Sequence, residues 1–95
     1  MGWIEWELRH RDEVLRHLQE AARITRQEPG CLSYVVAVAP EQPRRVHLFE
    51  LWRSMNALDE HLRTTHVAEF RRATAGFARI GRSLNWFVVS AAEPM

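Results

Sequence analysis

The hydrophobic pattern of this chain switches between a period of two and one of about 3.6 residues, in an order that few folds accommodate. Residues 3–9 alternate as a short strand, and apolar side chains then recur at helical spacing, with Asp12 as the expected N-cap, up to a turn at residues 28–30. Two strand-like stretches follow, residues 31–39 and 46–53, and the Pro-rich turn between them predicts a hairpin.

The second half of the chain repeats the helix–strand order. A helical region begins at Ser54, and Thr64 predicts a break in it, with Thr65 capping a second segment at residues 66–75. Residues 84–91 alternate again and predict the last strand. The order β-α-β-β-α-β predicts an α+β fold of the ferredoxin-like kind, whose antiparallel sheet carries both helical elements on one face.

The predicted strands are apolar on both faces, which indicates a partner. In the third strand, alternation places Val46 and Leu48 on one face and Phe49 and Leu51 on the other. A chain of 95 residues forms one domain, residues 1–95, whose helices cover only one side of the sheet. We therefore expect a homodimer that closes through the open sheet face.

Two compositional features exclude classes of chemistry. All 13 basic residues are Arg, so an enzyme that forms a Schiff base through lysine is excluded. Cys31 is the single cysteine, which excludes an intrachain disulfide and a cysteine-cluster metal site.

Charge and hydropathy argue against nucleic-acid and membrane partners. The net charge is +1, and the Arg residues are interleaved with Glu instead of forming a basic face. No stretch approaches the roughly 20 apolar residues of a membrane span, and residues 1–5 do not resemble a signal peptide. The expected location is cytoplasmic.

Four segments follow the pattern of a known family. They are residues 28–31 (EPGC), 48–52 (LFELW), 54–61 (SMNALDEH) and 65–70 (THVAEF). In this order and spacing they resemble the antibiotic-biosynthesis monooxygenase family over nearly the whole domain. The resemblance implies a dimeric α/β barrel. It also implies chemistry, because the members for which the family is named oxygenate polycyclic aromatic phenols or quinols without metal, flavin or haem.

Oxygenation without a cofactor requires few groups from a protein. A dry cavity with aromatic walls holds the phenol or quinol, one group removes a proton, and a cation or hydrogen-bond donor stabilises the anion. We therefore predict a cofactor-independent monooxygenase that takes a small hydroxylated aromatic or quinol and O2. The substrate is expected between the sheet and the second helical region.

The resemblance points to three catalytic residues. Trp52 matches the tryptophan that lines the substrate cavity in polyketide-oxidising members, although a core aromatic is the alternative. Arg72 aligns with an arginine near the substrate; Arg71 leaves this alignment open by one position, and a solvated helix-face arginine is the alternative. His66 takes the histidine position of "H-x-x-x-F", where it either accepts a proton or packs at the break between the helical segments.

Three further residues are expected to line the substrate site. Glu50 shares the face of Trp52, His61 lies five residues before His66, and Phe70 points inward from its helix. Each also suits an ordinary position at the helix–sheet edge. No two histidines have metal-ligand spacing in the sequence, so no metal site is predicted.

Two other functions stay open. A non-catalytic small-molecule-binding or interaction module would use the same dimer. A haem-degrading relative is disfavoured, because Arg71 stands where those members carry the haem-ligating histidine. Leu48 and Leu58 replace the asparagine and tyrosine of the polyketide-oxidising members, which argues against an anthrone-type substrate.

Overall fold

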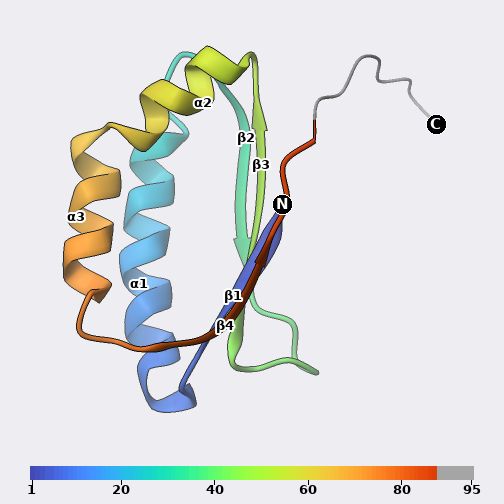
Figure 1. Ribbon diagram of the computed structural model, residues 1–95, viewed down its shortest axis with the longest axis vertical. Coiled ribbons are helices and arrows are strands. Elements are labelled where there is room, and N and C mark those ends of the chain that lie inside the picture. Colours follow the sequence, from blue (N-terminus) through green and yellow to red (C-terminus); the bar gives the residue numbers. More distant parts are fainter. Residues whose placement is uncertain (88–95) are drawn as a thin grey trace.

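The computed structural model of the protein describes residues 1–87 and confirms the predicted order of elements (Figure 1). The strands are β1 (Gly2–Trp6), β2 (Cys31–Ala37), β3 (Arg45–Trp52) and β4 (Arg79–Leu84), and the helices are α1 (Leu8–Thr25), α2 (Met55–Leu62) and α3 (Thr65–Thr74). None of the helices in this part of the chain has the length and apolar character needed to cross a bilayer.

The four strands form one antiparallel sheet in the order β2-β3-β1-β4. The central strand β1 places Ile4 opposite Val46 of β3 and opposite Arg82 of β4. In the hairpin of β2 and β3, Tyr34 lies opposite Glu50. Figure 1 shows the sheet nearly edge-on, with all three helices on one side of it. The architecture is the α+β, ferredoxin-like arrangement that the sequence predicts.

The core lies between α1 and the centre of the sheet. Val14 and Leu18 lie on one face of α1 and are 0% and 5% exposed, and they pack against Trp6 and Val46, each 1% exposed. Removing a side chain of this size from water contributes about 1.5–3 kcal/mol to stability. Leu48 packs partly buried against the same core and continues it toward the cavity described below.

The first helix starts earlier than the sequence pattern predicts. It begins at Leu8, directly after β1 ends, and the N–H of Arg11 already donates to the carbonyl of Glu7 at 3.1 Å. The prediction of Asp12 as N-cap is therefore wrong. Asp12 lies within the helix, and its carboxylate pairs with the Arg11 guanidinium at 2.6 Å. Polar residues at 9–12 interrupt the apolar period, so the sequence pattern does not indicate the first turn of this helix.

The last strand also differs from the prediction of residues 84–91, because β4 lies at Arg79–Leu84. Its pairing is set by β1, and the ladder closes where the N–H of Asn85 donates to the carbonyl of Met1 at 3.0 Å. Residues 85–87 have no regular structure, and the remainder of the predicted strand lies outside the described residues. Polar side chains within β4 obscure its alternation.

The second face of the sheet has no helix over it in the described part of the chain (Figure 1). Four of its apolar side chains, Leu32, Val35, Phe49 and Leu51, are between 41% and 56% exposed. On the same face, the Nε2 atom of His47 is buried and has no hydrogen-bond partner among residues 1–87. This is the face at which the sequence predicts a second copy of the chain.

Candidate active site

A cavity of about 380 Å³ opens between the sheet and the helices. Its apolar wall is formed chiefly by Ile4, Leu18, Leu48, Val67, Phe70 and Trp86. Its polar groups come from Tyr34, Glu50, His61, Arg71, Arg79 and Arg82. An apolar cavity of this volume with a few convergent polar groups has the character of a small-molecule site.

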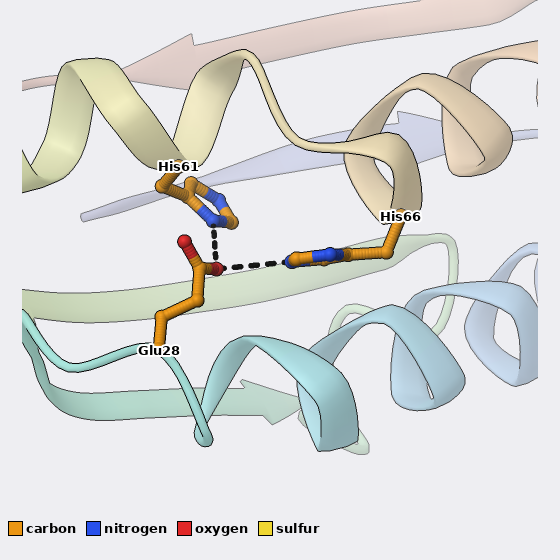
Figure 2. A group of neighbouring side chains, drawn as sticks. All are labelled: Glu28, His61 and His66. Atoms are coloured by element: carbon orange, nitrogen blue, oxygen red, sulfur yellow. Dashed lines mark hydrogen bonds and ion pairs between the residues drawn. The ribbon is translucent and has the colours of Figure 1, made fainter.

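At the edge of this cavity, two histidines meet one carboxylate (Figure 2). The Oε2 atom of Glu28 lies 2.7 Å from Nδ1 of His61 and 2.9 Å from Nε2 of His66. The side chains are only 16%, 4% and 12% exposed, in the order Glu28, His61, His66. We call these three residues the Glu28 cluster.

The break between α2 and α3 places the two histidines of the cluster. His61 lies in the last turn of α2, whose start is capped by Ser54, with its Oγ accepting from the N–H of Ala57 at 3.1 Å. The Thr64 hydroxyl donates to the carbonyl of His61 at 2.7 Å and so closes the end of α2. Thr64 precedes α3 and Thr65 is its first residue, so the predicted cap is off by one position. His66 therefore points back from the first turn of α3 toward His61.

The turn after α1 brings Glu28 under the two histidines. The N–H of Glu28 donates to the carbonyl of Thr25, and its own carbonyl accepts from Cys31, both at 3.0 Å. Gly30 allows this turn to approach α2, because a Cβ at that position would lie 2.3 Å from the Cβ of Ala57. The sequence therefore needs a glycine here to seat Glu28 against the helix.

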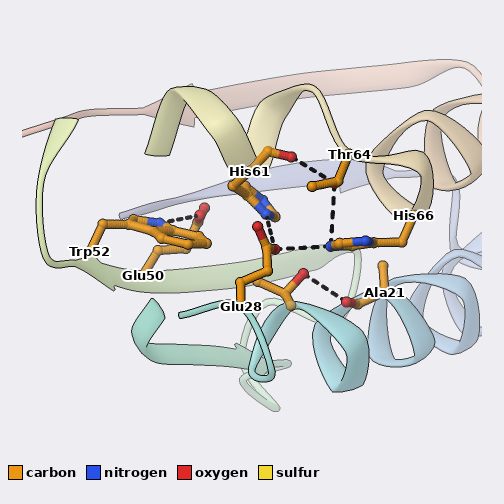
Figure 3. A network of polar contacts seen from close by, with 8 residues as sticks. Ala21, Glu28, Glu50, Trp52, His61, Thr64 and His66 are labelled. Carbon is orange, nitrogen blue, oxygen red and sulfur yellow. Dashed lines mark hydrogen bonds and ion pairs between the residues drawn. The ribbon is translucent and has the colours of Figure 1, made fainter. Parts of the chain in front are cut away.

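Trp52 lies beside His61 and connects the cluster to Glu50 (Figure 3). Its ring centroid lies 4.6 Å from that of His61, at an interplanar angle of 34°. Its indole N–H donates to Oε1 of Glu50 at 3.0 Å. Burial raises the pKa of the Glu50 carboxyl above its ordinary value, whereas the hydrogen bond from Trp52 acts in the opposite direction.

The geometry of the Glu28 cluster suits proton transfer. An ionised Glu28 can only accept hydrogen bonds, so it holds the proton of a neutral His61 on Nδ1. The second ring nitrogen, Nε2, then keeps its lone pair and can accept a proton from a molecule in the cavity. A carboxylate that orients a histidine in this way is a recurrent device in acid–base catalysis.

The structure brings five of the six predicted site residues into one region. Glu50, His61 and Phe70 line the cavity. Trp52 is set back from it and contacts two of the lining residues instead. His66 reaches the region through Glu28 and also lines a groove between α1 and α3.

The two neighbouring arginines of α3 point in different directions. Arg71 lines the cavity. The side chain of Arg72 is 80% exposed and lies 3.9 Å from Glu69 on the outer surface. The sequence left open which of the two arginines faces the cavity, and in the structure it is Arg71.

Glu28 is the residue that sequence reasoning missed. From the sequence, Glu28 is expected only in the turn that ends the first helix and in the EPGC segment, with no role in the site. A signal was nevertheless present, because Glu28, His61 and His66 each belong to one of the segments that carry the family resemblance.

Comparison with known proteins places the chain in a family. Residues 9–73 match the antibiotic biosynthesis monooxygenase family, and this range includes the whole Glu28 cluster. The chain is also 33% identical over 60 residues to the uncharacterized protein sll1783 of Synechocystis. That alignment covers 63% of this chain and 41% of the relative, so the chain spans about two fifths of the length of the curated protein it matches.

Solved structures share the fold. A candidate antibiotic biosynthesis monooxygenase from Deinococcus radiodurans has a TM-score of 0.85 at 25% identity, covering 99% of this chain and 94% of that one. Another antibiotic biosynthesis monooxygenase has a TM-score of 0.80 at 28% identity, with coverages of 98% and 95%. The protein PA3566 from Pseudomonas aeruginosa has a TM-score of 0.84 at 23% identity, covering 95% and 90%, and this likeness concerns the fold alone.

Proposed function

The chain belongs to the antibiotic biosynthesis monooxygenase family, and from this premise we propose that it is a cofactor-independent monooxygenase acting on a small hydroxylated aromatic or quinol. The observation that carries the proposal is the pair of Glu28 and His61, whose facing atoms are 2.7 Å apart at the wall of a cavity of about 380 Å³. The pair supplies a base, and the cavity supplies an apolar site for an aromatic ring.

His61 is the proposed base. It takes the hydroxyl proton of the substrate on Nε2, while Glu28 stabilises the imidazolium that forms. The resulting phenolate transfers an electron to O2 far more readily than the neutral phenol. His61 is 3% exposed and lies beside the ring of Trp52, so the proton transfer takes place away from bulk water.

Arginines on the cavity wall stabilise the negative charge that develops. Arg71, Arg79 and Arg82 all line the cavity and can donate to the phenolate and to the peroxide that follows. In the overall reaction one oxygen atom becomes a carbonyl of the product and the other leaves as water. For a naphthol, the hydroxyl O–H and one ring C–H supply the two hydrogens of that water, and the ring supplies the four electrons that reduce O2.

Trp52 positions the groups on either side of it. Its ring supports His61, and its indole N–H fixes the Glu50 carboxyl that lines the cavity. We assign Trp52 this positioning role in place of direct contact with the substrate.

The proposal includes a cytoplasmic homodimer formed through the open sheet face. Phe49 and Leu51 are 43% and 41% exposed there, and a second copy of the same face would remove both from water. A contact of this kind is isologous, because each copy contributes the same surface.

Oxygen uptake tests the proposal. Metal-stripped protein is mixed with a panel of quinols, naphthols and anthrones, and the autoxidation of each compound is subtracted. The wild type should consume O2 with at least one class. His61→Gln should lower the rate by about 100-fold or more, the usual effect of losing a general base. Trp52→Phe should lower it less, because the ring over His61 is retained.

The matched control is His17→Gln, the same change on α1 at a residue that lines a surface groove. Circular dichroism and gel filtration show whether each variant keeps the fold and the assembly state. Uptake by His61→Gln equal to that of the control would remove His61 as the base. A folded wild-type protein that consumes no O2 with any compound would favour the non-catalytic binding module instead.

A further inference from the structure

We propose that the Glu28 cluster binds a divalent transition-metal ion, with Zn²⁺ as the best fit, and that this ion moves the proton of His61 from Nδ1 to Nε2. The three side chains converge from the turn after α1, the last turn of α2 and the first turn of α3 (Figure 2). The inference goes beyond the proposed function, which the metal-free protein performs.

The ligand atoms already have the spacing of a metal site. One atom from each of Glu28, His61 and His66 lies within 4.8 Å of the other two. The two nitrogens are 2.7 and 2.9 Å from the same oxygen of Glu28. Adjacent ligand atoms on a tetrahedral metal with bonds of about 2.1 Å lie roughly 3.4 Å apart, so the nitrogens must move away from the Glu28 oxygen by only about half an ångström. Small side-chain rotations are therefore enough to place all three around one ion.

The kind of donor selects the kind of ion. Two imidazoles and one carboxylate suit Zn²⁺, Co²⁺ and Fe²⁺ better than Mg²⁺ or Ca²⁺, which prefer oxygen ligands throughout. Three protein ligands leave a fourth position for water or another small ligand. The Thr64 hydroxyl, 3.3 Å from Nε2 of His66, is close enough to hydrogen-bond to such a ligand.

The cluster is held in place from several sides, which favours metal binding over a chance contact. Trp52 packs on the His61 ring, and Thr64 closes the helix that carries His61. Gly30 seats the turn that carries Glu28. A site whose ligands are held in position before binding loses less conformational entropy when the ion arrives.

An ion has a route to the cluster from solvent. His66 lines an open groove between α1 and α3, together with His17, Glu20 and Glu69. His66 is the member of the cluster that lines this groove, so an ion enters the cluster from this side. The cavity that holds the proposed substrate meets the cluster at His61 instead.

Metal binding changes the proton at the cavity wall. The atom of His61 that faces Glu28 is Nδ1, so this is the atom that would ligate the ion. A neutral imidazole with a metal on Nδ1 carries its proton on Nε2. His61 would then present a hydrogen-bond donor to the cavity where the metal-free protein presents an acceptor.

Binding is tested without any substrate. Metal-stripped protein is titrated with Zn²⁺ against a chelating indicator of micromolar affinity, and with Co²⁺ while the visible absorption is recorded. The expected result is one ion per chain and a Co²⁺ spectrum typical of mixed nitrogen and oxygen ligation. Glu28→Gln and His66→Gln should each weaken binding by at least about 100-fold, because changes to outer-shell partners alone cost about 10–100-fold. His10→Gln, in the first turn of α1, is the control and should bind as the wild type does.

A second measurement keeps the test independent of the folding of these variants. Proton–nitrogen correlation spectra of the histidine side chains in the wild type report which ring nitrogen carries the proton. For His61 the proton should lie on Nδ1 without metal and on Nε2 with one equivalent of Zn²⁺. The proposal is overturned by a wild type that does not compete with the indicator, by equal affinity in the cluster variants, or by an unchanged His61 tautomer at full occupancy.

Discussion

The two faces of the sheet differ in how their side chains are covered. On the helix-covered face, β3 passes from the buried Val46 to Glu50 and Trp52, and each polar group there meets a partner within the chain. On the open face, the same strand exposes Phe49 and Leu51 and leaves a nitrogen of His47 without a partner in the described residues. Residues of the same chain cover one face, and the other face is suited to contact with a second copy.

The contrast follows from the number of layers that a small domain can build. One layer of helices covers one side of the sheet, and residues 1–87 contain no second helical layer for the other side. The polar chemistry therefore gathers on the covered side, where α2, α3 and the turn at Glu28 enclose it. The apolar side chains on the other side remain available for association.

The largest effect on oxygen uptake should come from a metal ion bound at the Glu28 cluster, on the covered face. If the Glu28 cluster binds Zn²⁺ as inferred, one equivalent should lower oxygen uptake by about 100-fold, because a His61 protonated on Nε2 cannot act as the base. Uptake is measured before and after Zn²⁺, and again after a chelator, which should restore it. Full activity in protein with demonstrated bound Zn²⁺ would break the link between this tautomer and catalysis.

The open face is tested by placing a charge in it. Phe49→Asp should weaken the dimer by at least about 30-fold, since a carboxylate in an apolar interface loses its hydration without gaining a partner. Light scattering coupled to gel filtration measures the mass over a dilution series. Leu8→Asp, on α1 at a residue that is 51% exposed, is the control and should leave the mass unchanged. A Phe49→Asp protein that remains dimeric would place the interface elsewhere.

The two neighbouring arginines of α3 test how far the covered region extends along this helix. Arg71→Gln should lower kcat/KM for an active substrate by about tenfold, because it removes a donor from the cavity wall. Arg72→Gln makes the same change at a side chain that is 80% exposed, and it should have little effect. Steady-state oxygen uptake distinguishes the two. A larger effect at Arg72 would restore the alignment that the family resemblance suggests.

The smallest effect concerns the charge of Glu50. Burial raises its pKa in the folded state, so the native protein holds this proton more tightly than the unfolded chain does. Ionised Glu50 therefore reduces stability at a pH above the raised pKa, and this cost is absent below the unfolded value of about 4.3. Glu50→Gln should raise Tm slightly at about pH 8 and leave it unchanged at about pH 4.

Thermal melts over this pH range measure the effect of Glu50→Gln. The amide oxygen of the variant still accepts from the indole N–H of Trp52, so the packing is kept. Glu60→Gln, an exposed position of α2, is the matched control. A gain in Tm of the same size at both pH values would show that the charge of Glu50 is not its cause.

Periodicity, turn residues and the family motifs were sufficient to predict the element order, the antiparallel ferredoxin-like sheet and the family. These features depend on residues close in sequence, where apolar spacing and turn chemistry act directly. The two largest errors in the predicted elements, the start of α1 and the position of β4, involve polar residues inside regular structure. At β4 the backbone pairing with β1 outweighs the local pattern, and at the start of α1 the backbone hydrogen bond from Arg11 to Glu7 does.

The chemistry of the site was decided only by the tertiary structure. Glu28 is 33 residues from His61 and 38 from His66 in sequence, and no local pattern shows that their polar atoms meet within 3 Å. The choice between Arg71 and Arg72 likewise depends on how α3 is rotated against the sheet. Helix rotation and the approach of a turn to a helix are set by packing, here through Gly30 against Ala57. The sequence by itself therefore determined the scaffold and the family, and packing between distant segments determined which side chains form the site.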